Sequence, residues 1–139
     1  MTLASFQSLC LDAHDAPALA GFWGAALGLG VVDTDDGGRR VVAREAFPGE
    51  AIWVDPVPED RTVKTRVHLD LRLPAADPAP LLEVGAALVR EPSDDVHWWV
   101  LADPDGNQFC AMPPAPPEWG IPPVEHPTAF ELVVDSVEE

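Results

Sequence analysis

The chain has 139 residues, of which 47% are hydrophobic, and its 24 acidic and 8 basic side chains give a formal net charge of −16. A chain of this length can build one hydrophobic core, or two small units that share one. The negative charge repels phosphate backbones and anionic membranes, so we expect neither nucleic acid nor a membrane as a partner. No apolar run approaches the roughly 20 residues that cross a bilayer, and the N-terminus lacks the basic start of a signal peptide, which predicts a soluble, cytoplasmic protein.

The two cysteines, Cys10 and Cys110, lie 100 positions apart in the chain and belong to no CxxC motif. This spacing is typical neither of a disulfide framework nor of a structural zinc site. We therefore expect two free, buried thiols.

The first half of the chain predicts a strand, a helix and three further strands. Residues 5–14 (SFQSLCLDAH) alternate in the manner of a half-buried strand. A helix of about twelve residues follows, with Asp15 as its N-cap, Pro17 in its first turn and Gly28 at its end. Turn signals at DDGG and FPGE then divide residues 31–57 into three short antiparallel strands.

The second half predicts the same order of elements. In TRVHLDLRL, strict alternation separates a face to be buried from a polar one, formed respectively by Val67, Leu69, Leu71 and Leu73 and by Arg66, His68, Asp70 and Arg72. A short helix follows, with Asp77 as N-cap, Pro78 at its first position and Gly85 as its stop. The segments AALVRE, VHWWVLA and NQFCAM supply three further strands.

The segment DPDGNQFC predicts a sharp reverse turn before the last of these strands. Asp103 and Asp105 are suited to cap the turn, and Gly106 can adopt a positive φ.

The remaining residues extend past this doubled pattern. The segment PPAPPEWGIPP is too rich in proline for a helix or a central strand and predicts an extended connector. Residues 130–134 have strong β propensity, and a strand left alone in solvent is an aggregation hazard. We therefore expect this strand to pair with an exposed sheet edge, either in its own chain or by exchange within a homodimer.

The doubled order of elements, with FWGAALGL, RVHLDL and DPDGNQFC at corresponding places, resembles the vicinal oxygen chelate superfamily in its glyoxalase-like branch (glyoxalase/bleomycin resistance/dioxygenase-like). The resemblance covers about residues 3–113. It implies an α+β fold in which paired βαβββ modules form curved mixed sheets around a cleft. The predicted organisation is one glyoxalase-like domain at 1–113, with modules at about 3–60 and 64–113, followed by a proline-rich connector and C-terminal strand at 114–139.

The resemblance also implies a place for a metal, with one ligand from the first and one from the last strand of each half. His68 matches the position in the first strand of the second half. Its counterpart in the first half is Ser8, or Gln7 if the strand slips by one residue. In the last strand of the second half, Cys110 stands where the metalloenzymes usually have glutamate. The equivalent position in the first half is Trp53 or Asp55.

This set of residues departs from a familiar metal centre. A neutral serine hydroxyl is a poor ligand for a divalent ion, and the Cys110 thiol has to ionise in a strongly acidic protein before it can bind one. We therefore favour no cofactor. A divalent metal (Zn, Ni, Fe or Mn) would require the set formed by Gln7, Asp55, His68 and Cys110.

The side chains expected to line a ligand-binding cleft are those on the faces away from the helices, namely Ser8, Cys10, Trp53, His68, Asp70, Arg72 and Cys110. Plainer roles stay open for several of them. His68 suits a hydrogen-bonded histidine on a polar strand face, the cysteines suit buried inert thiols, and Arg72 suits either an ion pair with Asp70 or a fork for a ligand carboxylate.

The function that follows is the binding of a small organic molecule between the two modules without a standard metal centre. The acidic surface and the aromatic side chains favour a cationic ligand. The alternative is a metal-dependent lyase, isomerase or dioxygenase-type enzyme of the same superfamily. The sequence leaves open whether the protein is catalytic and whether it is a monomer or a homodimer.

Overall fold

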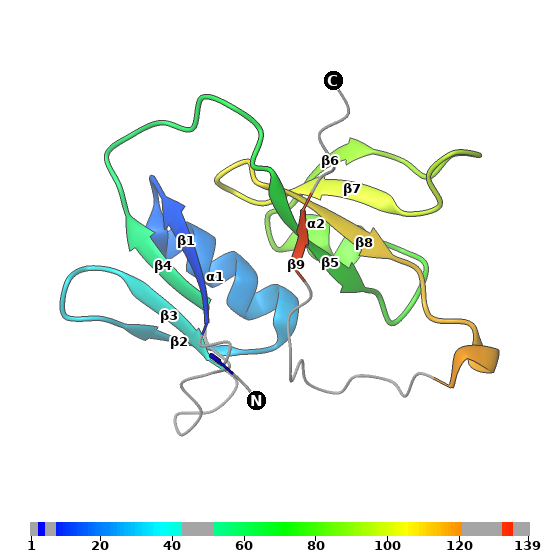
Figure 1. The fold of residues 1–139 in the computed structure, drawn as a ribbon, viewed down its shortest axis with the longest axis horizontal. Coiled ribbons are helices and arrows are strands. Elements are labelled where there is room, and N and C mark those ends of the chain that lie inside the picture. Colours follow the sequence, from blue (N-terminus) through cyan, green and yellow to red (C-terminus); the bar gives the residue numbers. More distant parts are fainter. Residues whose placement is uncertain (1–2, 5–7, 43–51, 121–131, 135–139) are drawn as a thin grey trace. The chain divides into compact units, whose positions relative to one another are not determined.

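A computed structural model of the chain describes residues 3–4, 8–42, 52–120 and 132–134. These residues form two compact units, one containing the described residues up to Asp60 and the other those from Arg61 onward. Each unit contains a strand, a helix and three further strands in that order (Figure 1). The predicted α+β fold of paired βαβββ modules is confirmed.

The first unit is a four-stranded mixed sheet with one helix against it (Figure 1). The strands lie in the order β1-β4-β3-β2, with β1 parallel to β4 and the other neighbours antiparallel. The elements in chain order are β1 (Leu9–Ala13), α1 (Ala16–Leu27), β2 (Gly30–Asp33), β3 (Arg39–Val42) and β4 (Ile52–Pro56).

Local sequence signals fix both ends of α1 as predicted. The Asp15 carboxylate accepts a hydrogen bond from the backbone N–H of Ala18 at 3.0 Å, and Pro17 occupies the first turn. Gly28 ends the helix with φ of 66°, a left-handed conformation that glycine adopts without a steric penalty.

The core of the first unit lies between α1 and its sheet. The helix buries three large apolar side chains, and the strands meet them with three more: Leu19, Phe22, Trp23, Val41, Ile52 and Val54. Each large apolar side chain buried in this way stabilises the fold by about 1.5–3 kcal/mol relative to leaving it exposed.

The second unit has a five-stranded sheet and a much shorter helix. The strands lie in the order β6-β7-β8-β5-β9, with β5 parallel to β8. The elements in chain order are β5 (Val67–Arg72), α2 (Ala79–Glu83), β6 (Ala87–Arg90), β7 (Trp99–Ala102), β8 (Gln108–Met112), the 3-10 helix η2 (Pro117–Trp119) and β9 (Leu132–Val134).

The helix of the second unit begins later than predicted. Pro78 precedes α2 as its N-cap residue, whereas the sequence pattern placed it at the first helical position. The Asp77 carboxylate still accepts a hydrogen bond from the backbone N–H of Ala79 at 2.9 Å. The prediction of Asp77 as the N-cap residue was wrong, since Pro78 takes that position and has no side chain that can cap the helix, which is only five residues long.

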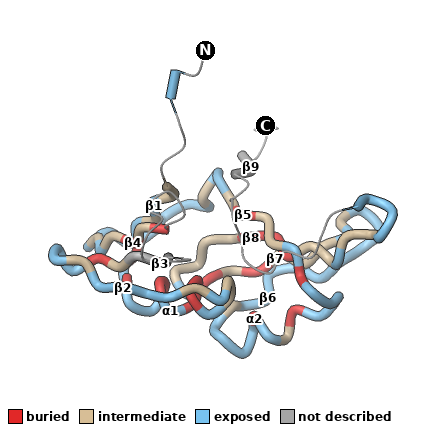
Figure 2. Tube along the Cα trace, turned by 90° about the horizontal axis from the view of Figure 1, so that it is seen from below, coloured by how far each residue is buried: buried red, intermediate tan, exposed pale blue. Residues whose placement is uncertain are grey.

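This short helix limits the burial of the second sheet. Leu69 and Leu73 are buried as predicted, whereas Leu71 is half-buried and Val67 is exposed. Figure 2 shows buried residues on α1 and β8, while β6 and most of α2 are exposed. The prediction of one continuous buried face on β5 was wrong, because five helical residues cover less of the sheet than the twelve of α1.

The predicted turn at DPDG is present and is organised by one carboxylate. Asp103 is buried, and its Oδ1 accepts hydrogen bonds from the backbone N–H groups of Asp105 at 3.1 Å and Asn107 at 2.9 Å. Gly106 has φ of 83°, as the turn requires. The turn sets the start of β8 and hence the position of Cys110.

The C-terminal strand β9 pairs antiparallel with β5 of the same chain (Figure 1). The paired positions run from Val67 opposite Val134 to Leu69 opposite Leu132. Phe130 and Glu131, the start of the predicted strand, lie outside the described residues. As a result, β5 has a neighbouring strand on both sides.

Candidate functional site

Two neighbouring strands bring three polar side chains to one place in the second unit. His68 and Asp70 are two residues apart on β5, so their side chains leave the same face of the sheet. Cys110 on β8 is the ladder partner of Asp70 in the parallel pair. We refer to His68, Asp70 and Cys110 as the β5–β8 cluster.

The atoms of the cluster lie close together. His68 Nε2 is 3.3 Å from Asp70 Oδ1, and one ligand-type atom from each of the three residues lies within 4.8 Å of the others. The side chains of His68 and Asp70 are 14% and 23% exposed, and Cys110 is 8% exposed. The cluster is therefore largely shielded from solvent, while His68 and Asp70 keep some access to it.

One carboxylate oxygen in the cluster accepts no hydrogen bond from the part of the chain that the structure describes. Asp70 Oδ1 is buried and has no hydrogen-bond partner among the described residues. Its 3.3 Å approach to His68 Nε2 is an ion-pair distance without the alignment of a hydrogen bond. A buried polar atom left without a partner costs about 1–3 kcal/mol, so a bound donor or cation at this oxygen would be strongly favoured.

The donor set of the cluster fits a divalent ion of the Zn²⁺ type. Imidazole nitrogen, carboxylate oxygen and thiolate sulfur are all zinc ligands in proteins. At bond lengths of about 2.0–2.3 Å, neighbouring ligands of a tetrahedral ion lie about 3.3–3.8 Å apart. Separations of up to 4.8 Å between the cluster atoms can close to these values by side-chain rotation. The ion would then bind Asp70 Oδ1, which accepts no hydrogen bond from the described residues.

Arg72 does not join the cluster. Its Nη1 donates a hydrogen bond to the carbonyl oxygen of Pro113 at 2.9 Å, and its guanidinium carbon lies 5.8 Å from the centre of the Trp119 ring. Arg72, at the end of β5, thus contacts the segment that follows β8 and holds it beside β5. The sequence pattern suggested a partner for this arginine in Asp70 or in a ligand, and it gave no sign of the contact with Trp119.

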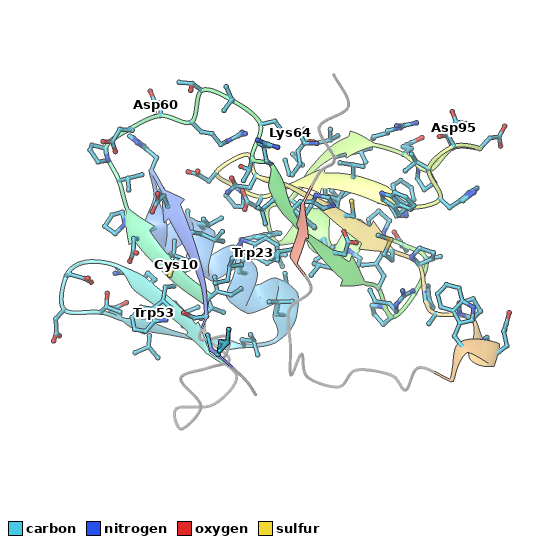
Figure 3. All side chains as sticks on the ribbon, viewed as in Figure 1. Cys10, Trp23, Trp53, Asp60, Lys64 and Asp95 are labelled. Atoms are coloured by element: carbon cyan, nitrogen blue, oxygen red, sulfur yellow. The ribbon has the colours of Figure 1, made fainter. Side chains whose placement is uncertain are left out.

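The predicted site residues of the first unit lie on or beside two paired strands. Cys10 on β1 is exposed, so the prediction of a buried thiol was wrong for this cysteine and right for Cys110. Cys10 is the ladder partner of Trp53 on β4, which is half-buried (Figure 3). Asp55 is half-buried on the same face of β4 as Trp53, and Ser8 is half-buried just before β1. Gln7 lies outside the described residues.

The cluster overlaps the predicted sites in part. His68 and Cys110 belong to the predicted metal set, whereas Asp70 was predicted only as a ligand-binding residue. The alternation of β5 already placed Asp70 beside His68 and could have identified it as a metal donor. The contributions predicted for Ser8, Cys10, Trp53, Asp55 and Gln7 stay predictions.

A sequence model of the glyoxalase-like domain family matches residues 8–112. Among curated proteins, none matches the chain. The family match covers both repeats of the strand-helix-strand pattern and ends with the last residue of β8.

Several solved structures share the fold. A glyoxalase/bleomycin resistance protein/dioxygenase family enzyme from Burkholderia phytofirmans aligns with a TM-score of 0.58 at 18% identity, covering 78% of this chain and 97% of its own. The fosfomycin resistance protein FosX from Mesorhizobium loti aligns with a TM-score of 0.62 at 11% identity, covering 85% and 98% of the two chains.

A FosX variant from Listeria monocytogenes, in complex with Mn(II) and 1S,2S-dihydroxypropylphosphonic acid, aligns with a TM-score of 0.59 at 10% identity. That alignment covers 83% of this chain and 93% of the FosX chain. At such low identities these structures establish a common fold.

Proposed function

Because the chain belongs to the glyoxalase-like domain family, we propose that it binds a small organic molecule, with the β5–β8 cluster as the centre of recognition. The observation that carries this proposal is Asp70 Oδ1, a buried oxygen to which none of the described residues donates a hydrogen bond. A ligand that donates a hydrogen bond there removes the penalty of the unpaired atom.

The ligand that suits this centre carries a cationic nitrogen. An ammonium or amidinium group supplies both the missing hydrogen bond and a charge opposite to that of Asp70. The net charge of −16 also raises the local concentration of cations around the protein. Arg72, the nearest arginine along β5, is engaged by Pro113 and Trp119 and leaves the carboxylate to a ligand.

The proposal is tested by calorimetric titration of the full chain with small amines and with uncharged compounds of the same shape. We expect the amines to bind the natural protein and to lose at least about 10-fold in affinity on Asp70→Asn, since a hydrogen bond to a charged group contributes about 1.5–3 kcal/mol. Asp95→Asn, at an exposed position of the same unit, serves as the matched control and should leave binding unchanged. Equal binding of amines to the natural protein and to Asp70→Asn contradicts the proposal.

A second candidate function is a metal-dependent lyase, isomerase or dioxygenase-type enzyme. The observation that favours it is the convergence of three metal-type donors within 4.8 Å, in a fold shared with a Mn(II) complex of FosX. His68, Asp70 and Cys110 would hold the ion. When bound, a divalent ion supplies Lewis-acid polarisation of a substrate oxygen. Elemental analysis of protein purified without chelator tests this candidate, and the absence of a stoichiometric divalent ion would count against it.

Other predictions of the sequence also stay proposals. These are the domain boundary at residue 113 and a cytoplasmic location, while the sequence leaves the choice between a monomer and a homodimer open. Among the described residues, no helix has the length and apolar character needed to cross a bilayer.

A further inference from the structure

We propose that the second unit alone supplies a thiolate-containing site for a borderline-soft divalent ion of the Zn²⁺ class, and that Cys110 sets its preference over hard ions such as Mn²⁺. This inference rests on the second candidate function above. It concerns which ion binds and which side chain selects it.

The sheet holds the three donors in place before any ion arrives. The β5–β8 ladder sets Cys110 opposite Asp70, and the strand period sets His68 beside Asp70. The residues on either side of Cys110, namely Phe109 and Ala111, are 1% and 0% exposed and anchor β8 in the core. Donors carried by packed strands are positioned more accurately than donors carried by loops.

The charges of the cluster match a divalent cation. With Cys110 as thiolate and Asp70 as carboxylate, two negative charges face the two positive charges of the ion, while His68 binds as a neutral imidazole. This charge neutralisation matters because the cluster is largely shielded from water. An uncompensated charge is costly in such an environment. Asp70 Oδ1, which accepts no hydrogen bond within the described ranges of the chain, is available to bind the cation.

The sulfur atom decides which ion is preferred. Thiolate is a soft ligand that favours Zn²⁺ and Co²⁺, whereas Mn²⁺ prefers carboxylate, carbonyl and water oxygen. A site of one imidazole and one carboxylate would discriminate between these ions less strongly. Cys110 is thus the residue in the cluster whose replacement should change the order of ion affinities.

The test uses the full chain in its reduced form, titrated with Zn²⁺, Co²⁺ and Mn²⁺ alone. We expect Zn²⁺ to bind one per chain and Cys110→Ser to weaken it by more than about 10-fold, since even outer-shell partners of a metal contribute about 10- to 100-fold in affinity. Mn²⁺ affinity should change by less than about 3-fold in the same variant, because Mn²⁺ gains little from sulfur. Cys110→Asp, which replaces sulfur by a hard oxygen ligand, should narrow the ratio of Zn²⁺ to Mn²⁺ affinity.

The cobalt complex identifies the ligand without relying on the folding of any Cys110 variant. A sulfur-to-cobalt charge-transfer absorption should appear in the natural protein and persist in Cys10→Ser. The chain has two cysteines, so persistence assigns the sulfur to Cys110. Loss of the absorption in Cys10→Ser, absence of Zn²⁺ binding, or equal Zn²⁺ affinity in a folded Cys110→Ser variant would each overturn the inference. Binding of amines by a protein that binds no Zn²⁺ would overturn it and leave the small-molecule proposal standing.

Discussion

At the scale of single residues, two glycines share a backbone conformation but not an environment. Gly37 and Gly106 have φ of 86° and 83°. An added Cβ at Gly37 would meet open space, whereas at Gly106 it would collide with the guanidinium group of Arg61. Arg61 also donates hydrogen bonds to the carbonyl oxygens of Asp105 at 3.4 Å and Val63 at 3.3 Å.

Replacing each glycine by alanine separates the cost of the left-handed backbone conformation from the cost of the collision with Arg61. Gly37→Ala should lower the free energy of unfolding by about 1–2 kcal/mol, the penalty for a side chain in the left-handed region. Gly106→Ala should lower it by up to about 1 kcal/mol more, because Arg61 has to give up its hydrogen bonds. Urea denaturation measures both changes. In an Arg61→Ala background the difference should vanish, and a difference that persists would show that Arg61 is not its cause.

The turn between β2 and β3 contains a carboxyl group with a perturbed pKa. Hydrogen bonds from the Thr34 hydroxyl, and then from the backbone N–H of Gly38, hold the pKa of Asp36 below its ordinary value. A depressed pKa stabilises the fold above the unfolded-state value of about 3.9, and this contribution is lost as pH falls through the folded-state value.

The prediction is that Thr34→Val raises the pKa of Asp36 towards its ordinary value. This substitution removes the Thr34 hydroxyl, whose hydrogen bond is the largest cause of the lowered pKa. Carboxyl-carbon NMR titration between about pH 2 and 6 measures this directly. Asp35, an exposed neighbour in the same turn, is the internal control. An unchanged titration of Asp36 in Thr34→Val would assign the shift to the backbone of the turn.

The cluster shows how far sequence reasoning reaches at this scale. Alternation along β5 predicted that His68 and Asp70 share a face, because strand period is a local property. The pairing of Asp70 with Cys110 joins residues 40 positions apart through the register of β5 and β8, which no local pattern contains. The engagement of Arg72 by Trp119 was unpredictable for the same reason.

At the scale of elements, β9 protects one edge of β5. An open strand edge offers unpaired backbone groups to other chains, and β9 occupies this edge along Val67–Leu69. Truncation after Gly120 removes β9 but keeps η2 and its contact with Arg72. We expect the truncated chain to fold, to lose about 1–3 kcal/mol of stability, and to self-associate more at high concentration.

Urea denaturation and light scattering after size exclusion measure the two effects. The control is removal of the last five residues, 135–139, which leaves β9 intact. Unchanged stability in the chain truncated after Gly120 would contradict a structural role for β9. A dimer mass for the full chain together with a monomer mass for the truncated chain would show that β9 is exchanged between two chains.

The helices show which local signals are sufficient. For α1, the cap at Asp15, the apolar spacing and the stop at Gly28 all agree, and the predicted helix is the observed one. For α2, the same kinds of signal predicted where the helix lies in the chain. They did not predict how much of the sheet the helix covers. Whether Val67 and Leu71 are buried depends on the length of α2, and the residue pattern of β5 holds no information about that length.

At the scale of the whole molecule, the dominant property is a net charge of −16 on 139 residues. Like charges confined to a compact fold repel one another, and salt screens that repulsion with a Debye length of about 8–10 Å near physiological ionic strength. We expect the stability to rise by about 1 kcal/mol between low salt and 0.2 M NaCl, which corresponds to a rise in melting temperature of about 3–6 °C for a chain of this size.

Thermal unfolding in NaCl and in tetramethylammonium chloride checks the origin of this effect. Screening acts equally in both salts, whereas specific binding of a small cation does not. A melting temperature that falls with salt would show that favourable ion pairs, such as Arg39 with Asp33 at 3.0 Å, outweigh the repulsion.

The exposure of Cys10 allows a covalent contact between two copies of the chain. A solvent-exposed thiol oxidises in air, and two chains joined through Cys10 would form a covalent dimer that reflects storage conditions and not native assembly. Cys110, which is buried, is protected from this reaction. Oligomeric state is therefore best measured on Cys10→Ser, and a dimer band that disappears with reducing agent should be read as an artefact of handling.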